Sequence, residues 1–355
     1  MQYHYHHDVC SLITATIIGA SGYSGAELLR LLAPRKDVTL LHAAAATSAG
    51  KRIADAYPAL EGAGDREYSS VARALEDPVD IAFVALPSGE AMHIVPKLLR
   101  IAGRVIDLGG DFRLPVHLYE KYYGHPHAAP ELVSEAVYGL PEFNHDKIAH
   151  ARLIANPGCY PTSIILALLP ALRRGYISPE NIVINALSGI TGAGRTASTD
   201  FSFSEINENI RAYKIGTHQH VPEISTVLNV ASGKEISFSF VPHLVPLNRG
   251  IYSTIHATLS SPITEAEIVS AYREFFPEDA FVRITCMIPQ LKNVTGTNYC
   301  EINVRKHPTT NQLIIISVID NLIKGAAGQA IQNMNIACGL PHYAGLREKE
   351  TVHVA

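Results

Sequence analysis

Residues 13–32 read ITATIIGASGYSGAELLRLL, and this stretch decides the fold of the first half of the chain. Ile13 to Ile18 is a β-branched, apolar run that is typical of a buried parallel strand. It leads directly into Gly19-Ala20-Ser21-Gly22-Tyr23-Ser24-Gly25, after which leucines follow at helical spacing. Strand, glycine turn and helix are the context of a dinucleotide-binding turn, in which the helix start holds a pyrophosphate. The spacing is GxxGxxG rather than GxGxxG, so an ordinary strand-to-helix turn is the alternative.

The segment after the second expected strand, Val38 to His42, bears on the choice of dinucleotide. An NAD site places Asp or Glu there, on the ribose 2′-hydroxyl. This chain instead has Thr47 and Ser48, followed by Lys51 and Arg52. Hydroxyl groups and cations suit a 2′-phosphate, which favours NADP(H) over NAD. The alternative is that both cations are solvated loop charges.

The composition restricts the class of protein. With 355 residues the chain is long enough for two domains. Its net charge of −4 gives no basic footprint for nucleic acid, and no apolar run approaches the roughly 20 residues that span a bilayer. Five cysteines lie far apart without a CxxC pair, which indicates reduced thiols and a cytoplasmic protein. The histidine-rich residues 1–11 are expected to form a tail rather than a metal site.

Two further strands are expected at 80–86 and 105–108, each followed by a loop. Loops at the carboxyl ends of parallel strands face the ligand crevice. Arg113, in Gly109-Gly110-Asp111-Phe112-Arg113, is therefore a candidate anion-binding residue. Its alternative role is a surface salt bridge.

Cys159 is the candidate nucleophile. It lies in Asn156-Pro157-Gly158-Cys159-Tyr160-Pro161-Thr162, between the apolar residues 153–155 and a long apolar segment from Ser163 to Leu172. This layout predicts a strand, a tight turn and a helix that starts at the thiol. Backbone N–H groups and the helix dipole favour a thiolate there. The alternative is a small buried hydrophobic residue.

The second half of the chain contains clustered strands, which predict a mixed sheet. They are expected at 181–187, 236–241, 251–259, 281–287, 299–304 and 313–319. Between them, alternate spacing in Thr217-His218-Gln219-His220 places two imidazoles on one side of an extended segment. A cysteine that accepts an acyl group needs such a proton shuttle, and Glu223 is expected to orient the imidazole. A zinc pair is disfavoured because no third ligand follows at a recognisable spacing, and structural histidines are the remaining alternative.

Taken together, these motifs resemble the N-acetyl-gamma-glutamyl-phosphate reductase family from about Thr16 to Leu340. The motifs are GASGYSG at 19–25, DFRL at 111–114, KYYG at 121–124, YGLPE at 138–142, PGCYPT at 157–162, SGITGAGR at 188–195, THQHVPEI at 217–224 and DNLIKGAAGQA at 320–330. One departure is Gln219, where the family often has arginine.

The resemblance implies an α/β fold with a Rossmann-type NADP-binding domain and an α+β catalytic and oligomerisation domain with a mixed sheet. We assign residues 12–158 and 325–355 to the first domain, 159–324 to the second, and 1–11 to the tail. A homodimer or homotetramer is expected, without nucleic-acid or membrane partners.

The reaction that the resemblance implies is NADPH-dependent reduction of N-acetyl-gamma-glutamyl phosphate, a small-molecule acyl phosphate, to N-acetylglutamate 5-semialdehyde in arginine biosynthesis. Phosphate is released as a thioester forms on Cys159. His218 is the preferred acid/base, and Asn156 aids backbone N–H groups in stabilising the oxyanion. The implied substrate-binding residues are Arg113, Arg195, His220, Glu223 and Arg249. The implied NADP(H)-binding residues are Gly19, Ser21, Gly22, Tyr23, Ser24, Gly25, Ser48, Arg52, Pro87, Ser188, Gly189 and Asn321. No metal is expected.

Two alternatives to this function stay open. One is a related reductase that acts on aspartyl phosphate or on a carrier-linked aminoadipyl phosphate. The other is a non-catalytic NADP-binding regulator, which the presence of Cys159, His218 and His220 disfavours.

Overall fold

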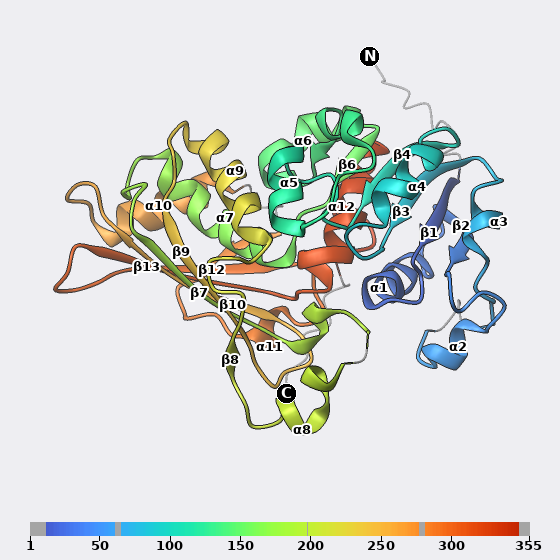
Figure 1. The fold of residues 1–355 in the computed structure, drawn as a ribbon. Helices are drawn as coiled ribbons and strands as arrows, with labels where there is room; N and C mark the ends of the chain where they lie inside the picture. The colour runs from blue at the N-terminus through green and yellow to red at the C-terminus, as the bar shows by residue number, and fades with distance from the viewer. Residues whose placement is uncertain (1–11, 61–64, 197, 277–280, 348–355) are drawn as a thin grey trace, which may run out of the picture.

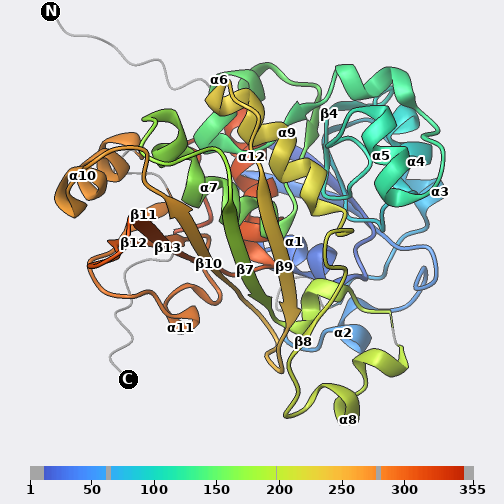
Figure 2. The ribbon, with the colours of Figure 1, turned by 60° about the vertical axis from the view of Figure 1, so that its left-hand side comes forward.

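Two β-sheets organise the molecule, and the computed structural model describes them over residues 12–60, 65–196, 198–276 and 281–347. The first sheet and its helices lie beside the second sheet, so that the chain has two lobes (Figures 1 and 2). The expected tail, residues 1–11, and Cys10 within it lie outside the described residues. The division into 12–158 with 325–355 and 159–324 stays a prediction.

The first sheet has six strands, all paired in parallel, in the order β2-β1-β3-β4-β6-β5. The buried strand expected at 13–18 is confirmed, because Ala15, Ile17 and Ile18 have no exposed surface. The six strands are β1 (Ile13–Ile18), β2 (Val38–Ala44), β3 (Val79–Val84), β4 (Ala102–Asp107), β5 (Val137–Tyr138) and β6 (Leu153–Ala155).

The helices of this lobe follow its strands along the chain, as parallel pairing requires. They are α1 (Tyr23–Leu32), α2 (Ile53–Ala56), α3 (Val71–Ala74), α4 (Ala91–Leu98), α5 (Val116–Tyr123), η1 (Pro130–Ser134) and α6 (Pro141–His150). The last helix of the chain, α12 (Gly328–Ala337), returns to this lobe and buries Ile331 and Met334 in the same core as β1. β1 has β2 on one side and β3 on the other, which makes its carboxyl end the switch point where such folds bind ligands.

The second sheet has seven strands and is mixed, as the sequence predicts. Its order is β11-β12-β13-β10-β7-β9-β8, with parallel pairs β7–β9 and β11–β12 and antiparallel pairs elsewhere. The strands are β7 (Ile182–Ser188), β8 (Arg211–Ala212), β9 (Phe238–Leu244), β10 (Ile251–Thr258), β11 (Val282–Ile284), β12 (Cys300–Lys306) and β13 (Gln312–Ile319).

The helices of the second lobe lie mainly on one face of this sheet (Figure 1). They include α7 (Cys159–Arg173), α9 (His220–Ser232) and α10 (Glu265–Phe275), together with the short α8 (Phe203–Ile206), α11 (Leu291–Val294), η2 (Ile190–Ala193) and η3 (Thr199–Phe201). On β7 and β10, buried residues alternate with partly exposed ones, so the opposite face is only partly covered. No helix among the described residues is long and apolar enough to cross a membrane.

Helix α7 joins the two lobes. It follows β6 of the first sheet, yet Ile164, Ile165 and Leu168 lie in the core of the second lobe. Pro161 is tolerated in its first turn, where the backbone N–H has no partner within the helix. The cysteine turn therefore belongs to the ligand edge of the first sheet while its helix is held by the second.

Local expectations for the segments 217–220 and 281–287 differ from the structure. The segment 217–220 is not extended, since Gln219 has helical backbone angles and α9 begins at His220. In the motif at 320–330, a π-helical turn, η4 (Ile323–Ala327), precedes α12. The strand expected at 281–287 is also shorter, since only 282–284 pair with β12.

Candidate active site

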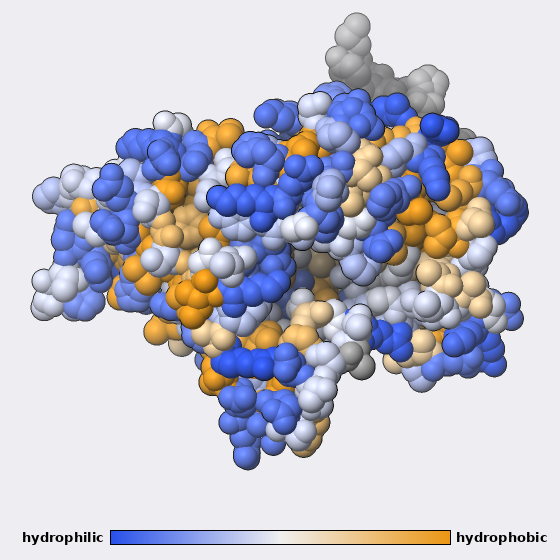
Figure 3. Space-filling view, in the orientation of Figure 1, coloured by the Kyte–Doolittle hydropathy of each residue, from blue (hydrophilic) through white to orange (hydrophobic). Residues whose placement is uncertain are grey.

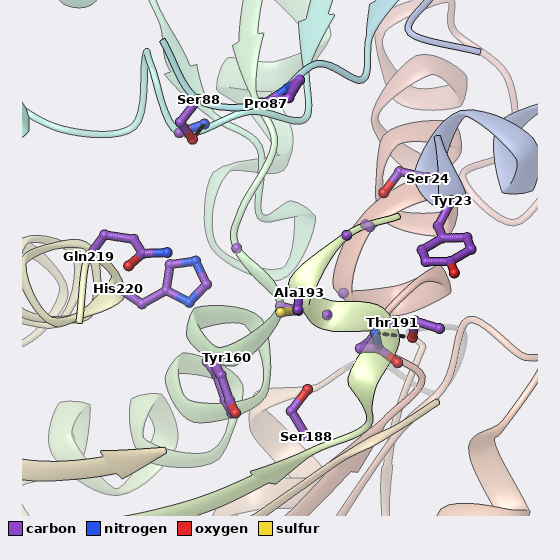
Figure 4. Close-up of a pocket in the computed structure, with 18 of the residues that line it drawn as sticks. Tyr23, Ser24, Pro87, Ser88, Tyr160, Ser188, Thr191, Ala193, Gln219 and His220 are labelled. Atoms are coloured by element: carbon purple, nitrogen blue, oxygen red, sulfur yellow. Dashed lines mark hydrogen bonds between the residues drawn. The ribbon is translucent and has the colours of Figure 1, made fainter. Parts of the chain in front are cut away.

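A cavity of about 910 Å³ lies between the lobes. One wall is made by loops at the carboxyl ends of β1, β3, β4 and β6, and the other by the loop after β7 and the segment that leads into α9. The space-filling view is hollowed in this region (Figure 3). In the close-up, Tyr23 and Ser24 lie on one side of the pocket, and His220 and Tyr160 lie across from them (Figure 4).

The glycine turn has the conformation that its sequence predicts. Gly19 has a φ of +87°, and a Cβ atom there would lie 2.3 Å from the Ala85 carbonyl oxygen. A Cβ atom on Gly25 would lie 2.3 Å from the Gly19 oxygen, so helix α1 approaches the strand closely. Gly22 is the N-cap of α1, and no side chain caps this helix. The start of α1 therefore faces the cavity with its N–H groups available to an anion.

The structure brings half of the implied cofactor residues to the cavity. Those that line it are Gly22, Tyr23, Ser24, Pro87, Ser188 and Asn321. Those that do not are Gly19, Ser21, Gly25, Ser48, Arg52 and Gly189. Gly19 and Gly25 shape the turn instead. Arg52 is exposed on the loop after β2, with its guanidinium 3.9 Å from Asp65.

Cys159 is the first residue of α7 and lines the cavity. Burial raises the pKa of the Cys159 thiol to about 11, although the Tyr160 backbone N–H and the Arg113 charge act in the opposite direction. The expectation that the helix start makes Cys159 a thiolate is therefore wrong for this packing, because desolvation outweighs the helix terminus. A thiolate requires that a base take the proton.

The residue before the thiol is held by a buried carboxylate. Glu223, from α9, accepts hydrogen bonds from the Gly158 N–H and the Tyr138 hydroxyl, both at 2.8 Å. Its second oxygen lies 3.4 Å from a terminal nitrogen of Arg113. Neither imidazole donates to Glu223 in the described residues, so the prediction that Glu223 orients a histidine is wrong. It instead fixes the backbone beside Cys159.

Arg113 is confirmed as a cavity residue rather than a surface ion pair. Its side chain donates to the carbonyl oxygens of Asn156 at 2.7 Å and Leu108 at 2.6 Å. Burial alone would lower the pKa of Arg113, but Glu223 and nearby tyrosines hold it above its usual value, so the guanidinium stays charged. A Cβ atom on Gly158 would lie 3.0 Å from this guanidinium, which places the cation beside the cysteine turn.

Asn156 does not line the cavity, and the structure does not place it as an oxyanion donor. Its amide nitrogen donates to the Ala326 carbonyl at 3.1 Å, and its amide oxygen accepts from Asn333 at 3.0 Å. Both partners belong to the segment after β13. Asn156 therefore links the cysteine turn to the π-helical turn η4.

The turn η4 packs against Cys159. A Cβ atom on Gly325 would lie 2.8 Å from the Cys159 Cβ, so only glycine fits against this side chain. The neighbouring Lys324 is fully buried and donates to Glu142 at 2.7 Å and Gln332 at 2.9 Å. Sequence reasoning missed this ion pair, although Lys324 lies in the motif at 320–330.

The two histidines lie together, with ring centroids 4.7 Å apart. The His220 backbone N–H donates to Nδ1 of His218 at 3.1 Å. A Cβ atom on Gly158 would lie 2.6 Å from Nε2 of His220, so this imidazole is the one beside the cysteine turn. Burial lowers the pKa of His218 to about 2 and the pKa of His220 well below its usual value. Both rings are therefore neutral, and burial makes each a weaker base than a free imidazole.

The other two predicted arginines are engaged elsewhere. Arg195 lines the cavity but donates to the Ser21 carbonyl at 2.8 Å and stacks on Tyr57. Arg249 does not line the cavity, because it bridges Glu27 at 2.6 Å and Asp320 at 3.0 Å. The prediction that Arg249 contacts substrate is thus not supported by this geometry. Both arginines connect the second lobe to helix α1 or to the glycine turn.

The donor groups of the cavity do not form a metal site. Within the described residues no set of three His, Cys, Asp or Glu side chains is placed to hold an ion. The pair His218 and His220 has no third ligand of this kind.

Comparison with known proteins identifies the family. Two family models match, "Semialdehyde dehydrogenase, NAD binding domain" over residues 14–151 and "Semialdehyde dehydrogenase, dimerisation domain" over 159–321. The N-acetyl-gamma-glutamyl-phosphate reductase of Symbiobacterium thermophilum is 46% identical over 341 residues, which cover 94% of this chain and 97% of that protein. The enzyme of the same name from Dehalococcoides mccartyi is 47% identical over 335 residues, with the same coverages.

Solved structures support the fold. Aspartate semialdehyde dehydrogenase II from Vibrio cholerae matches with a TM-score of 0.69 and 19% identity, over 92% of this chain and 98% of that one. Aspartate semialdehyde dehydrogenase with NADP from Candida albicans matches with a TM-score of 0.69 and 18% identity, over 92% and 99%. The chain belongs to the semialdehyde dehydrogenase family and, within it, to the N-acetyl-gamma-glutamyl-phosphate reductases.

Proposed function

We propose that this protein reduces N-acetyl-gamma-glutamyl phosphate to N-acetylglutamate 5-semialdehyde with NADPH, releasing phosphate, as a step of arginine biosynthesis. The observation that carries the proposal is the placement of Cys159, beside His220 and Arg113, across one cavity from an open glycine turn. Nucleophile, proton acceptor and phosphate-binding cation are the groups that acyl transfer from a phosphate requires. The N-acetyl-gamma-glutamyl-phosphate reductases of Symbiobacterium thermophilum and Dehalococcoides mccartyi are 46% and 47% identical to this chain.

The residues on the cavity wall fit a dinucleotide. Gly22 has no Cβ to obstruct close approach of a pyrophosphate, and the uncapped start of α1 offers N–H groups to it. Pro87, Ser188 and Asn321 would lie along the nicotinamide end, and Ser48 and Arg52 are proposed for the 2′-phosphate. When bound there, NADPH supplies the hydride that reduces the acyl carbon.

Cys159 is the proposed nucleophile. As the Cys159 sulfur attacks the acyl carbon, the thiol proton passes to an imidazole. The bond between the acyl carbon and the phosphate oxygen then breaks, phosphate departs, and the acyl group remains on Cys159 as a thioester. Because both histidines are neutral and the thiol is protonated, this transfer accompanies attack rather than preceding it. The backbone N–H groups at the start of α7 are the proposed oxyanion donors.

His220 is the proposed proton acceptor, although the sequence favoured His218. Nε2 of His220 lies beside Gly158, whereas His218 packs behind it and accepts the His220 backbone N–H. Asparagine substitutions separate the two: His220→Asn should slow acylation more than His218→Asn. The reverse order would restore the assignment made from the sequence.

Arg113 is the proposed phosphate-binding residue. It stays charged, is fixed by two carbonyl oxygens, and lies beside the turn that carries the nucleophile. A planar guanidinium suits a phosphate that is leaving the adjacent carbon. Arg195 is proposed to contact the cofactor side of the cavity rather than the reacting carbon, since it is held at Ser21.

We further propose that the protein is a homo-oligomer, either a dimer or a tetramer, and acts in the cytoplasm. The match of residues 159–321 to a dimerisation domain and the partly covered face of the second sheet support self-association. Cys159, Cys286, Cys300 and Cys338 are free thiols, as expected of a reducing compartment.

The test is the reverse reaction with phosphate and NADP⁺, followed by NADPH absorbance. We expect turnover with N-acetylglutamate 5-semialdehyde. Turnover with aspartate semialdehyde alone would contradict the proposed substrate and leave the reaction type intact. NADPH binding without turnover of any semialdehyde would favour a regulator.

A further inference from the structure

Lys214 occupies an unusual backbone position at the cavity. It lies between β8 and α9 and is one of the lining residues. Its φ is +44°, a left-handed conformation that few residues other than glycine adopt among the described residues. Strained backbone conformations of this kind cluster at catalytic and ligand-binding sites.

The ammonium group of Lys214 has no carboxylate partner among the described residues. It donates to the amide oxygen of Gln219 at 3.1 Å, and this amide carries no charge. Gln219 is drawn beside His220 at the rim of the pocket (Figure 4). The Lys214 ammonium is therefore held at the histidine segment by a neutral partner, and no carboxylate among the described residues neutralises its charge.

The other cations of the cavity are engaged differently. Arg113 is paired with Glu223, and Arg195 is held at the glycine turn by Ser21. Arg211 donates to the Asp200 carbonyl and stacks on Phe201. Among the lining residues, Lys214 thus combines a free charge with a position next to the imidazoles.

The position of Lys214 relative to the thiol distinguishes it from Arg113. Burial is the largest influence on the pKa of both histidines, and Lys214 lowers the pKa of each further, which places its charge near them. The Arg113 guanidinium would lie 3.0 Å from a Cβ atom on Gly158, the residue before Cys159, whereas the Lys214 ammonium contacts Gln219. Arg113 therefore lies beside the cysteine turn, and Lys214 lies at the segment that leads into α9.

The proposed substrate carries two anions at different distances from the reacting carbon. Its phosphate is bonded to that carbon through oxygen, while its α-carboxylate is attached to the α-carbon, at the other end of the molecule. We infer that Lys214 binds the α-carboxylate of the acyl substrate and so selects a carboxylated substrate, while Arg113 binds the phosphate. This inference rests on the proposed function and adds the residue that recognises the remote end of its substrate.

The test compares Lys214→Met with Lys214→Arg and with Lys234→Met, an exposed lysine outside the cavity. In the reverse reaction, Lys214→Met should raise the KM for N-acetylglutamate 5-semialdehyde by about 10- to 100-fold, the loss expected for one charge-assisted hydrogen bond. The KM for phosphate should stay within about twofold. Lys214→Arg should recover most of the loss, and Lys234→Met should behave as wild type.

A second measurement does not depend on the amount of folded enzyme. The wild type should prefer the free α-carboxylate over its methyl ester, and Lys214→Met should lose this preference. An unchanged preference, or a rise in the KM for phosphate alone, would overturn the assignment. If the wild type turns over only another semialdehyde, the proposed function fails instead, so the two failures are distinguishable.

Discussion

Two strand–turn–helix units of the first sheet end at the same cavity and are used in opposite ways. The β1–α1 turn places Gly22 at its helix start with no side chain upon it, and this end stays open. The β6–α7 turn also has a glycine N-cap, Gly158, but its N–H is taken by Glu223. The N-cap of α1 is therefore contacted by no side chain, whereas the N-cap of α7 is fixed by a carboxylate that leaves the next N–H groups of that helix for the proposed oxyanion.

The difference fits the proposal that one local structure serves cofactor binding in one place and chemistry in another. An open helix start suits a phosphate that arrives with the cofactor. A nucleophile must instead be held in one geometry, since a small misplacement slows the reaction. The Cys159 turn is accordingly held by a hydrogen bond from Gly158 to Glu223 and by close packing of Cys159 against Gly325. The following substitutions break one unit while leaving the other intact.

The largest effect is expected from Cys159→Ala, which removes the chemistry and leaves the cofactor turn untouched. Turnover should fall by about 10⁴-fold or more, as for other covalent nucleophiles. NADPH affinity, measured by calorimetry, should stay within about twofold of wild type. Retained turnover would refute the nucleophile assignment, and lost NADPH binding would show that the two turns are not independent.

The next largest effect should come from Glu223→Ala, which frees the Gly158 N–H and unpairs Arg113. We expect kcat to fall about 100-fold, the cost of a misplaced reacting group, while the KM for NADPH changes little. Glu223→Gln is the matched control because its amide oxygen can still accept from Gly158. If Gln lost as much as Ala, the charge opposite Arg113 would matter more than the backbone contact.

A stability effect separates two glycines of the β1–α1 turn. Gly25→Ala places a methyl group 2.3 Å from the Gly19 oxygen and should destabilise the fold by about 1–3 kcal/mol, as overpacking does. Gly22→Ala meets its nearest atom at 3.6 Å and should leave the Tm unchanged while weakening NADPH binding. Thermal unfolding with and without NADPH measures both. Equal melting temperatures for the two variants would contradict the close approach at Gly25.

The smallest effect concerns pH. Since burial raises the pKa of Cys159 to about 11, its thiolate fraction in the free protein grows as pH rises toward that value. Alkylation of Cys159 by iodoacetamide should therefore keep accelerating up to about pH 11. Peptide mapping can follow it with the exposed Cys286 as internal reference for the reagent. A rate that levels off below pH 8 would show that the protein ionises the thiol without substrate.

The sequence predicted the parts of the site that depend on neighbouring residues. The glycine turn and the helix that begins at Cys159 follow from local strand, turn and helix patterns. The wrong or missing assignments involve partners distant in the chain, such as Glu223 with Gly158 and Asn156 with Ala326. No local pattern reveals which carboxylate reaches a given N–H. The π-helical turn and the Lys324–Glu142 pair depend on packing between lobes in the same way.

The thiol pKa was mispredicted for a related reason. A helix start favours a thiolate, and that local effect is present, but the surrounding burial is larger and comes from the tertiary fold. Arg249 was misassigned because its acidic partners, Glu27 and Asp320, lie far from it in sequence. Local patterns predicted which side chains line the cavity, such as Cys159 and His220, better than they predicted what holds them.

The central claim is that Cys159 carries the acyl group during turnover. The direct measurement mixes the protein with N-acetyl-gamma-glutamyl phosphate in the absence of NADPH, quenches in acid and examines peptides by mass spectrometry. We expect one N-acetylglutamyl group on the peptide that contains Cys159, released phosphate in equal amount, and loss of the adduct when NADPH is added before quenching. An unmodified Cys159 peptide from protein that turns over with NADPH would contradict the account.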